Sequence, residues 1–370
     1  MTSSAGVPTV FAVPLAEHTT LRLGGPAGRL VFAETPETLV NAVQSGDADA
    51  IAAGESPPLV LGGGSNVLVC DAGVPGTTVL VATKGRAVAP RAGGARLTVE
   101  AGEDWDSVVA ATVAEGWSGL ECLSGIPGRV GAVPVQNVGA YGVEIAELLV
   151  DVDLYDRRAG RVRMHVPAAE LGLGYRTSAL KGRDEAVVLR VRLDVAAGPF
   201  SGPLRYPELA RALDVPVGAR APIAEVREAV LALRRSKGMV LDTCDHDTWS
   251  AGSFFTNPVL DAATADRVAA VAGVGVGVGV GVADMPRWPT ENGLVKLSAA
   301  WLISHAGFER GHPGPGGRVG LSGRHSLALT NRGGGTAADL LGLAREVRDG
   351  VWARFGVRLT AEPVLVGCTL

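Results

Sequence analysis

A glycine-rich stretch of 19 residues, "SGIPGRVGAVPVQNVGAYG" (124–142), constrains most strongly what this chain can fold into. Its glycines let the backbone approach another group closely, and its two prolines stiffen it. Gln136 and Asn137 add amide donors and acceptors. An irregular loop of this length inside a compact chain is usually functional. The stretch therefore predicts a ligand site in which the ligand lies close to the backbone.

A second glycine-rich loop lies within "PLVLGGGSNVLV" (58–69), which has the pattern of a strand, a loop and another strand. It is not a P-loop, because no Gly-Lys-Ser/Thr follows, and it is not a Rossmann fingerprint, because it leads into a strand. Such a loop can still direct N–H groups at a pyrophosphate, although a tight β-turn would explain the same residues. Two glycine loops in one N-terminal α+β domain suit a dinucleotide bound outside a Rossmann fold.

Composition narrows the class of protein. The 370 residues are 47% hydrophobic and 19% charged, which predicts two or three domains with real cores. A net charge of -4 disfavours a broad basic surface for nucleic acid. The four cysteines form no C-x-x-C pair, which argues against a metal knuckle or a disulfide scaffold. With no Lys or Arg in 1–21 and no apolar run of membrane-spanning length, we expect a cytoplasmic protein.

Periodicity predicts alternating strands and helices. "RLVFAETPETLVNAV" (29–43) is typical of a strand followed by a helix that Thr35 caps and Pro36 begins. Asp104 is expected to cap the next helix. The expected helices cover residues 103–116, 223–237, 295–308 and 337–356, and the expected strands include "GTTVLVAT", "RLTVEAG", "LLVDVDLYD", "VVLRVRLDV" and the residues around Glu362. The Gly-Val tract 273–282 is interpreted as a surface loop, with a weak strand as the alternative.

Eight motifs occur in an order that resembles one family, the UDP-N-acetylenolpyruvoylglucosamine reductases. The resemblance runs from about residue 18 to the C-terminus. The motifs are "LGGGSNVLV", "SGIPGRVGAVPVQNVGAYG", "YRTS", "RRSK", "AGSFFTNP", "AAWLI", "GRHSLALTN" and "FGVRLTAEPVLVG". Each motif alone is weak evidence for the family, but all eight in this order are specific evidence.

The resemblance implies an α+β fold whose FAD-binding domain, of the p-cresol methylhydroxylase type, has two α+β subdomains, 1–85 and 86–215. A substrate-binding α+β domain, 216–356, and a C-terminal strand, 357–370, that returns to the active site would follow. The implied cofactor is non-covalent FAD, with NADPH as co-substrate. The implied partner is a nucleotide sugar of peptidoglycan synthesis, bound by a monomer with no nucleic acid or membrane partner.

The resemblance also implies residue roles. Ser253 matches the family's proton donor, Arg176 its catalytic arginine and Glu362 its catalytic glutamate. The implied substrate-binding residues are Tyr175, Tyr206, Lys237 and Asn257, where Tyr206 resembles the mobile tyrosine of the class with an extra tyrosine loop. The implied cofactor-binding residues are Gly62, Gly63, Gly64, Ser65, Asn66, Gly125, Ile126, Pro127, Gly128, Gly131, Gln136, Asn137, Gly139, Ala140 and Tyr141.

Several of these residues also have a purely structural interpretation. Without the resemblance, Ser253 is a turn serine, Arg176 a surface ion-pair residue and Glu362 a solvent-facing strand residue. Lys237 then only complements a helix dipole. The role of His325 is left open between a structural one and one beside the flavin. The histidines show no metal-ligand spacing, so no metal is expected. A serine is a weak acid that needs a polarising neighbour, which the sequence does not identify.

The chain departs from the family pattern in three places. The segment "GMVLDTCDHDTWSAG" after Lys237 is long, and its acidic residues suggest either a solvated loop or a cation site. Thr256 stands where lysine is frequent, which puts one diphosphate contact in doubt, and the Gly-Val tract is extra. Two rival functions fit less well: a flavin oxidase of the same fold that acts on a sugar or alcohol, and a non-catalytic protein that binds a nucleotide sugar.

Overall fold

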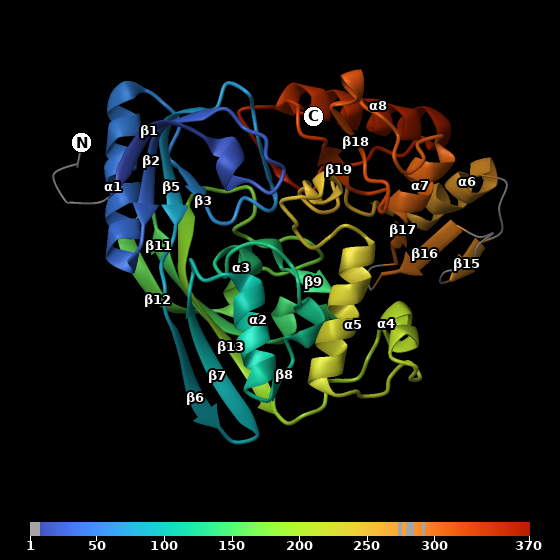
Figure 1. Cartoon of the computed structure of the whole chain (residues 1–370), viewed down its shortest axis with the longest axis horizontal. Helices are drawn as coiled ribbons and strands as arrows, with labels where there is room; N and C mark the ends of the chain where they lie inside the picture. The colour runs from blue at the N-terminus through green and yellow to red at the C-terminus, as the bar shows by residue number, and fades with distance from the viewer. Residues whose placement is uncertain (1–7, 273–275, 279–284, 291–292) are drawn as a thin grey trace. The chain divides into compact units, whose positions relative to one another are not determined.

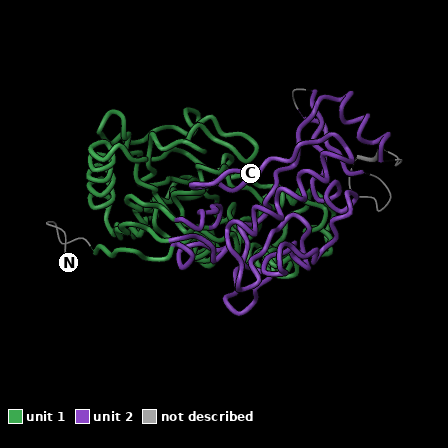
Figure 2. Tube along the Cα trace, turned by 90° about the horizontal axis from the view of Figure 1, so that it is seen from above, with its two compact units in different colours: residues 1–14, 26–64, 73–240 green, residues 15–25, 65–72, 241–370 purple. Residues whose placement is uncertain are grey.

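The computed structural model of the chain describes residues 8–272, 276–278, 285–290 and 293–370. The chain divides into two compact units, which Figure 2 shows in different colours. Unit 1 consists of residues 1–14, 26–64 and 73–240. Unit 2 consists of residues 15–25, 65–72 and 241–370, so two short N-terminal segments belong to the unit that the C-terminal third completes. The four-segment division expected from the family resemblance stays a prediction.

The first sheet of unit 1 has the order β1-β2-β5-β3, with β1 antiparallel to β2 and the other neighbours parallel. Helix α1 packs on β2 and β5 (Figure 1). It begins as expected, because Thr35 Oγ1 accepts the Thr38 N–H at 3.1 Å and Pro36 is its first residue. The bounds are β1 Thr9–Pro14, β2 Pro26–Ala33, α1 Pro36–Ala53, β3 Leu59–Leu61 and β5 Val74–Val81.

The second sheet of unit 1 is antiparallel, with the order β12-β11-β13-β7-β6, and β8 also pairs with β13. The strands expected from "RLTVEAG", "LLVDVDLYD" and "VVLRVRLDV" are its three central strands, so these predictions are confirmed. Apolar side chains from both sheets, α1 and α2 form one core. The bounds are β6 Arg86–Arg91, β7 Gly94–Glu100, β8 Trp117–Ser118, β11 Leu149–Asp156, β12 Arg161–Pro167 and β13 Ala186–Ala197.

Short helices and 3-10 turns complete unit 1. Asp104 caps α2 as expected, because its carboxylate accepts the Ser107 N–H at 2.9 Å. The stretch 124–142 is not irregular throughout, since it contains α3 and β9; the expectation of a continuous loop is wrong over those residues. The bounds are α2 Trp105–Ala114, η2 Glu121–Leu123, α3 Ala132–Gln136, β9 Gly139–Ala140, β10 Val143–Glu144, η3 Ile145–Glu147, η4 Ala168–Leu171, α4 Pro207–Ala212 and α5 Ile223–Ser236.

Unit 2 has a sheet of order β14-β17-β16-β15 and two small pairs, β18-β19 and β4-β20. The helix expected over 295–308 is shorter, because its first three residues form β17. In the Gly-Val tract three residues form β15, parallel to β16, so the loop interpretation is wrong there; the other residues of the tract lie outside the described residues. The bounds are η1 Leu15–His18, β4 Val67–Val69, η5 His246–Thr248, β14 Val259–Leu260, α6 Ala262–Ala272, β15 Val276–Val278, β16 Met285–Pro289, β17 Val295–Leu297, α7 Ala299–His305, η6 Pro315–Gly317, β18 Val319–Leu321, β19 Leu329–Asn331, α8 Ala337–Phe355 and β20 Val364–Val366.

Segments far apart in the sequence build unit 2. Strand β4 pairs in parallel with β20, with Val67 opposite Val364. The carboxylate of Asp71 accepts the N–H groups of Ala337 and Ala338 at 2.7 and 2.9 Å, which satisfies the free donors at the start of α8. The strand expected around Glu362 begins two residues later, at Val364.

Candidate active site

The two glycine-rich loops meet backbone to backbone in unit 1. A Cβ atom on Gly63 would lie 2.8 Å from the Cα of Gly128, so this approach requires glycine. The first loop does not close a hairpin between its flanking strands, because β3 pairs with β5 whereas β4 pairs with β20. Its residues 62–64 belong to unit 1, and Ser65 and Asn66 belong to unit 2.

The start of the longer loop is held by an ion pair. The carboxylate of Asp106 accepts the Gly125 N–H at 2.6 Å and two N–H groups of Arg227 at 2.7 and 2.9 Å. Burial opposes the charge on Asp106, and the hydrogen bonds from Arg227 and Gly125 nevertheless hold its pKa below the ordinary value. Sequence reasoning missed both residues, because no local pattern marks two side chains that meet across α2 and α5.

The two amide residues of this loop have different surroundings. Asn137 is buried in a left-handed conformation, and its Nδ2 donates to the Gly174 carbonyl and Glu144, while its Oδ1 accepts the Ala146 N–H. The amide of Asn137 is thus occupied by protein groups. The Oε1 atom of Gln136 is buried with no hydrogen-bond partner among the described residues. An orphaned acceptor is costly, and it fits an N–H donor such as that of a flavin ring.

Arg176 is placed against the same loop. Its Nη2 donates to the Gly139 carbonyl at 2.7 Å, and its guanidinium lies over the Tyr175 ring at 5.5 Å. The backbone of Arg176 is left-handed, with φ 54°, a conformation that costs a non-glycine residue about 1–3 kcal/mol. Strain of this kind concentrates at functional sites, which agrees with the role that the resemblance implies.

Tyr141, Tyr206 and Lys237 come together in unit 1. The tyrosine rings pack edge to face with centroids 5.4 Å apart, and Lys237 Nζ is 6.0 Å from the Tyr141 centroid. Lys237 also forms an ion pair with Glu208 at 2.5 Å. Burial raises the pKa of Tyr141 to about 12, so its hydroxyl stays a hydrogen-bond donor at neutral pH.

Ser253 and Glu362 lie on adjacent segments of unit 2. The Glu362 N–H donates to the Phe254 carbonyl at 2.9 Å, and Phe255 pairs with Ala361 in a β-bridge. Phe254 and Phe255 are 1% exposed, so they anchor the segment in the core and leave the half-buried Ser253 side chain at its edge. Of the three expected catalytic residues, unit 2 contains these two and unit 1 contains Arg176.

His325 is the neighbour of Ser253 that sequence reasoning left open. Its Nε2 is 3.4 Å from Ser253 Oγ, and 72 residues separate the two in the chain. Nearby, the Oδ1 of Asn257 accepts the Ala299 N–H at the start of α7, and Asn66 Nδ2 donates to the Glu362 carbonyl at 3.4 Å. These two expected binding residues therefore also position their own segments.

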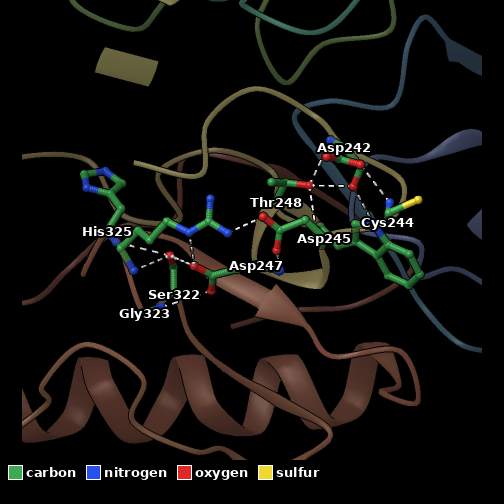
Figure 3. A network of polar contacts seen from close by, with 10 residues as sticks. Asp242, Cys244, Asp245, Asp247, Thr248, Ser322, Gly323 and His325 are labelled. Atoms are coloured by element: carbon green, nitrogen blue, oxygen red, sulfur yellow. Dashed lines mark hydrogen bonds and ion pairs between the residues drawn. The ribbon is translucent and has the colours of Figure 1, made fainter. Parts of the chain in front are cut away.

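The acidic segment after Lys237 is organised around an arginine. Arg324 forms ion pairs with Asp245 and with Asp247, and Thr248 donates to the Asp242 carbonyl at 2.8 Å (Figure 3). The hydrogen bond from Arg324 holds the pKa of Asp245 below its ordinary value. Residues 241–244 and His246 are exposed, which agrees with the solvated loop expected from sequence, and Arg324 supplies the positive charge beside Asp245 and Asp247.

One group among the described residues has ligand atoms close enough for a metal ion, namely Asp151, Asp153 and His165. Arg192 Nη1 donates to the two carboxylates at 2.6 and 2.8 Å. Arg190 also pairs with Asp153 at 3.4 Å, so two guanidinium groups face the two carboxylates, and this sheet-bound cluster is explained as an ion-pair network.

Comparison with known proteins assigns the chain to a class. Residues 27–164 match the family model of an FAD binding domain, which includes both glycine-rich loops and defines a flavoprotein. Residues 244–366 match the model of the UDP-N-acetylenolpyruvoylglucosamine reductase C-terminal domain. Together with the relatives described next, these matches show that the chain belongs to the UDP-N-acetylenolpyruvoylglucosamine reductase family.

Relatives match over nearly the whole chain. The UDP-N-acetylenolpyruvoylglucosamine reductase of Saccharopolyspora erythraea is 61% identical and that of Salinispora arenicola 54%, each over 96% of this chain and 95% of the relative. A crystal structure of the Thermus caldophilus reductase superposes with a TM-score of 0.63 at 26% identity, covering 97% of this chain and 98% of that one. The expected family, α+β fold class and FAD cofactor are confirmed. Among the described helices, none has the length and apolar character needed to cross a membrane.

Proposed function

We propose that the chain reduces UDP-N-acetylglucosamine enolpyruvate to UDP-N-acetylmuramate for peptidoglycan synthesis, using NADPH and bound FAD. The observation that carries the catalytic assignment is the half-buried Ser253 hydroxyl beside the segment of Glu362. Membership in the reductase family supports the reaction. The two glycine-rich loops and Gln136 would hold the cofactor.

The residue types suit the two parts of the reduction. When bound, reduced FAD supplies a hydride to the terminal vinyl carbon of the enolpyruvyl group. Arg176 stabilises the negative charge that grows on the substrate carboxylate as an enolate forms, and Glu362 adds a hydrogen bond to it if its own proton is retained. Ser253 then donates a proton to the α-carbon, so that the double bond gains one hydride and one proton in total.

Tyr206 supports a finer assignment, to the class with an extra tyrosine loop. It directly precedes α4, and its ring packs on Tyr141 beside Lys237. In this proposal Tyr206 and Lys237 contact the nucleotide sugar. Tyr206→Ala is expected to raise the KM for the enolpyruvyl substrate while FAD reduction by NADPH is unchanged; an unchanged KM would contradict this class.

The test of the proton donor is Ser253→Ala. Because the reaction has two halves, FAD reduction by NADPH should survive, whereas flavin reoxidation by the enolpyruvyl substrate should slow by about 10²–10⁴-fold. Stopped-flow absorbance measures each half separately. Reoxidation at the wild-type rate would show that Ser253 is not the proton donor.

Each rival function predicts a different experimental result. A flavin oxidase with tethered FAD keeps its yellow colour in the protein pellet after acid precipitation, whereas non-covalent FAD stays in solution. NADPH oxidation that depends on UDP-N-acetylglucosamine enolpyruvate separates the proposed enzyme from both the oxidase and a non-catalytic binding protein. We expect colour in the supernatant and substrate-dependent oxidation.

A further inference from the structure

Ser253 needs a neighbour that makes its hydroxyl a better acid, and the structure offers one. His325 Nε2 lies 3.4 Å from Ser253 Oγ, and both side chains are half-buried. This distance is at the long end of the hydrogen-bond range, as is common for catalytic pairs before substrate binds. The segments of the two residues are also joined, since the Phe254 N–H donates to the Leu327 carbonyl at 2.7 Å.

The turn that carries His325 is fixed by the buried Ser322. Ser322 Oγ accepts the backbone N–H groups of Arg324 and His325 at 3.0 and 3.1 Å. The Ala328 N–H closes the turn by donating to the His325 carbonyl at 3.0 Å. The backbone of His325 is therefore held on both sides.

Asp247 holds this turn from the acidic segment. One carboxylate oxygen accepts from Ser322 Oγ at 2.9 Å and the other accepts the Gly323 N–H at 3.0 Å (Figure 3). Arg324, the next residue, is 3.3 Å from Asp247 and also pairs with Asp245. The Asp247 carboxylate thus contacts Ser322, Gly323 and Arg324 directly, and it is connected to His325 through Ser322.

The acidic segment is itself well ordered. Asp245 accepts the Asp247 N–H at 3.0 Å, and the Thr248 hydroxyl bonds the carbonyls of Asp242 and Asp245 at 2.8 and 2.7 Å. Thr248 is buried. A segment with this many internal bonds can set the position of what it binds, which a mobile loop cannot do.

We propose that His325 is a positioning residue for Ser253 and that Asp247 and Asp245 hold it in place. This rests on the proposed function, in which Ser253 donates the proton. The imidazole Nε2–H donates to Ser253 Oγ, so the hydroxyl proton points away from the ring and the charge growing on Oγ is stabilised. The proton goes to the α-carbon of the substrate, and the serine oxygen then regains a proton from water.

A double-mutant cycle on flavin reoxidation tests this coupling. His325→Ala should slow reoxidation of NADPH-reduced enzyme by about tenfold to a hundredfold and leave FAD reduction unchanged. Because His325 acts through the hydroxyl, the double variant Ser253→Ala/His325→Ala should be no slower than Ser253→Ala alone. If the two slowdowns multiply, the residues act independently and the inference is wrong.

The outcomes separate this inference from the proposed function. If Ser253→Ala reoxidises at the wild-type rate, the proton-donor assignment itself is wrong. If Ser253→Ala is slow and His325→Ala is as fast as wild type, only the role of His325 is wrong.

A conservative variant separates hydrogen bonding from packing. Gln places an N–H donor at a similar reach, so His325→Gln should recover most of the rate that His325→Ala loses. The solvent deuterium isotope effect on reoxidation should be larger in His325→Ala than in wild type, because proton transfer becomes more rate-limiting. A glutamine variant as slow as the alanine variant would show that only ring shape matters.

Asp247→Asn tests the support of the turn. Asparagine keeps the shape but loses the charge that binds Arg324, so reoxidation should slow by about threefold to tenfold with FAD reduction unchanged. The matched control is Asp266→Asn, which removes an exposed ion pair with Arg287 elsewhere in unit 2. Equal rates in the two variants would contradict a role for Asp247.

Discussion

Gly63 in one loop and Gly128 in the other allow a close backbone contact because neither has a side chain. The contact of Gly63 with Gly128 joins stretches that the sequence analysis could only propose separately. Because the contact is backbone to backbone, neither neighbour can rotate a side chain out of the way. It makes the two loops one surface, and we expect that surface to hold the cofactor.

Gly63→Ala is expected to force the loops apart. A methyl group 2.8 Å from the Gly128 Cα requires a backbone shift, which costs about 1–3 kcal/mol. The purified variant should carry less FAD, measured as visible absorbance per protein, and should melt at a lower temperature. The matched control is Gly202→Ala, also in unit 1, because a methyl group there meets no atom within 4 Å. Full FAD content in Gly63→Ala would refute the proposed role of this contact.

The residues of the candidate site could be predicted where a sequence motif surrounds them. The contacts between those residues could not be predicted. Ser253, Arg176 and Glu362 were proposed from their motifs, and their catalytic roles stay predictions. The approach of His325 to Ser253 was not predicted, because 72 residues separate them and no periodicity relates the two. The motif did not predict that the Asn137 side-chain amide bonds to Gly174, Glu144 and Ala146, and its expected cofactor contact stays a prediction.

Helix ends could be predicted because capping is local. Thr35 and Asp104 cap the helices that follow them, as expected. Strand partners are not local: β3 and β4 are separated only by the first glycine loop, yet they join different sheets. The start of α8 combines both cases, since Thr336 caps it from the adjacent position and Asp71 caps it from far away in the chain.

Asp339→Asn is expected to make stability less dependent on pH. Hydrogen bonds from Arg318 and Thr336 lower the pKa of Asp339 to about 2, below an unfolded value of about 3.9. A lowered pKa adds stability that is fully present above the unfolded value and is lost as pH falls toward about 2. The variant should therefore melt below the wild type at pH 6, and the gap should narrow between pH 4 and 2, measured by circular dichroism.

The control for this prediction lies on the same helix. Asp349 is paired with the adjacent Arg348, and its side chain is 63% exposed. Exposed pairs contribute little to stability, so Asp349→Asn should melt close to the wild type at every pH. A constant gap between wild type and Asp339→Asn across pH 2–6 would mean that the charge of Asp339 is not what stabilises α8.

At the scale of the whole molecule, each unit has its own core, and unit 2 is discontinuous. Leu21, Leu23 and Leu68 from the N-terminal segments belong to the same core as Phe254 and the apolar face of α8. The family resemblance placed the start of the substrate-binding domain at residue 216, and no sequence pattern indicates that two short early segments belong with the last third.

An isolated fragment 241–370 is expected not to fold cooperatively. It lacks the partner of β20, the Asp71 carboxylate at the start of α8 and the three core leucines of the N-terminal segments. Thermal unfolding followed by circular dichroism should show no sharp transition, whereas the full chain should show one. Adding a peptide of residues 15–72 as a control should restore part of the transition; a fragment that melts sharply by itself would contradict the prediction.

The pairing of β4 with β20 has a consequence for synthesis in the cell. Val67 leaves the ribosome long before its partner Val364. Domains generally fold as their residues emerge, and unit 1 can do so while translation continues. Unit 2 must wait for its last third, so a ribosome that stalls before β20 leaves apolar segments uncovered and exposed to chaperones and proteases.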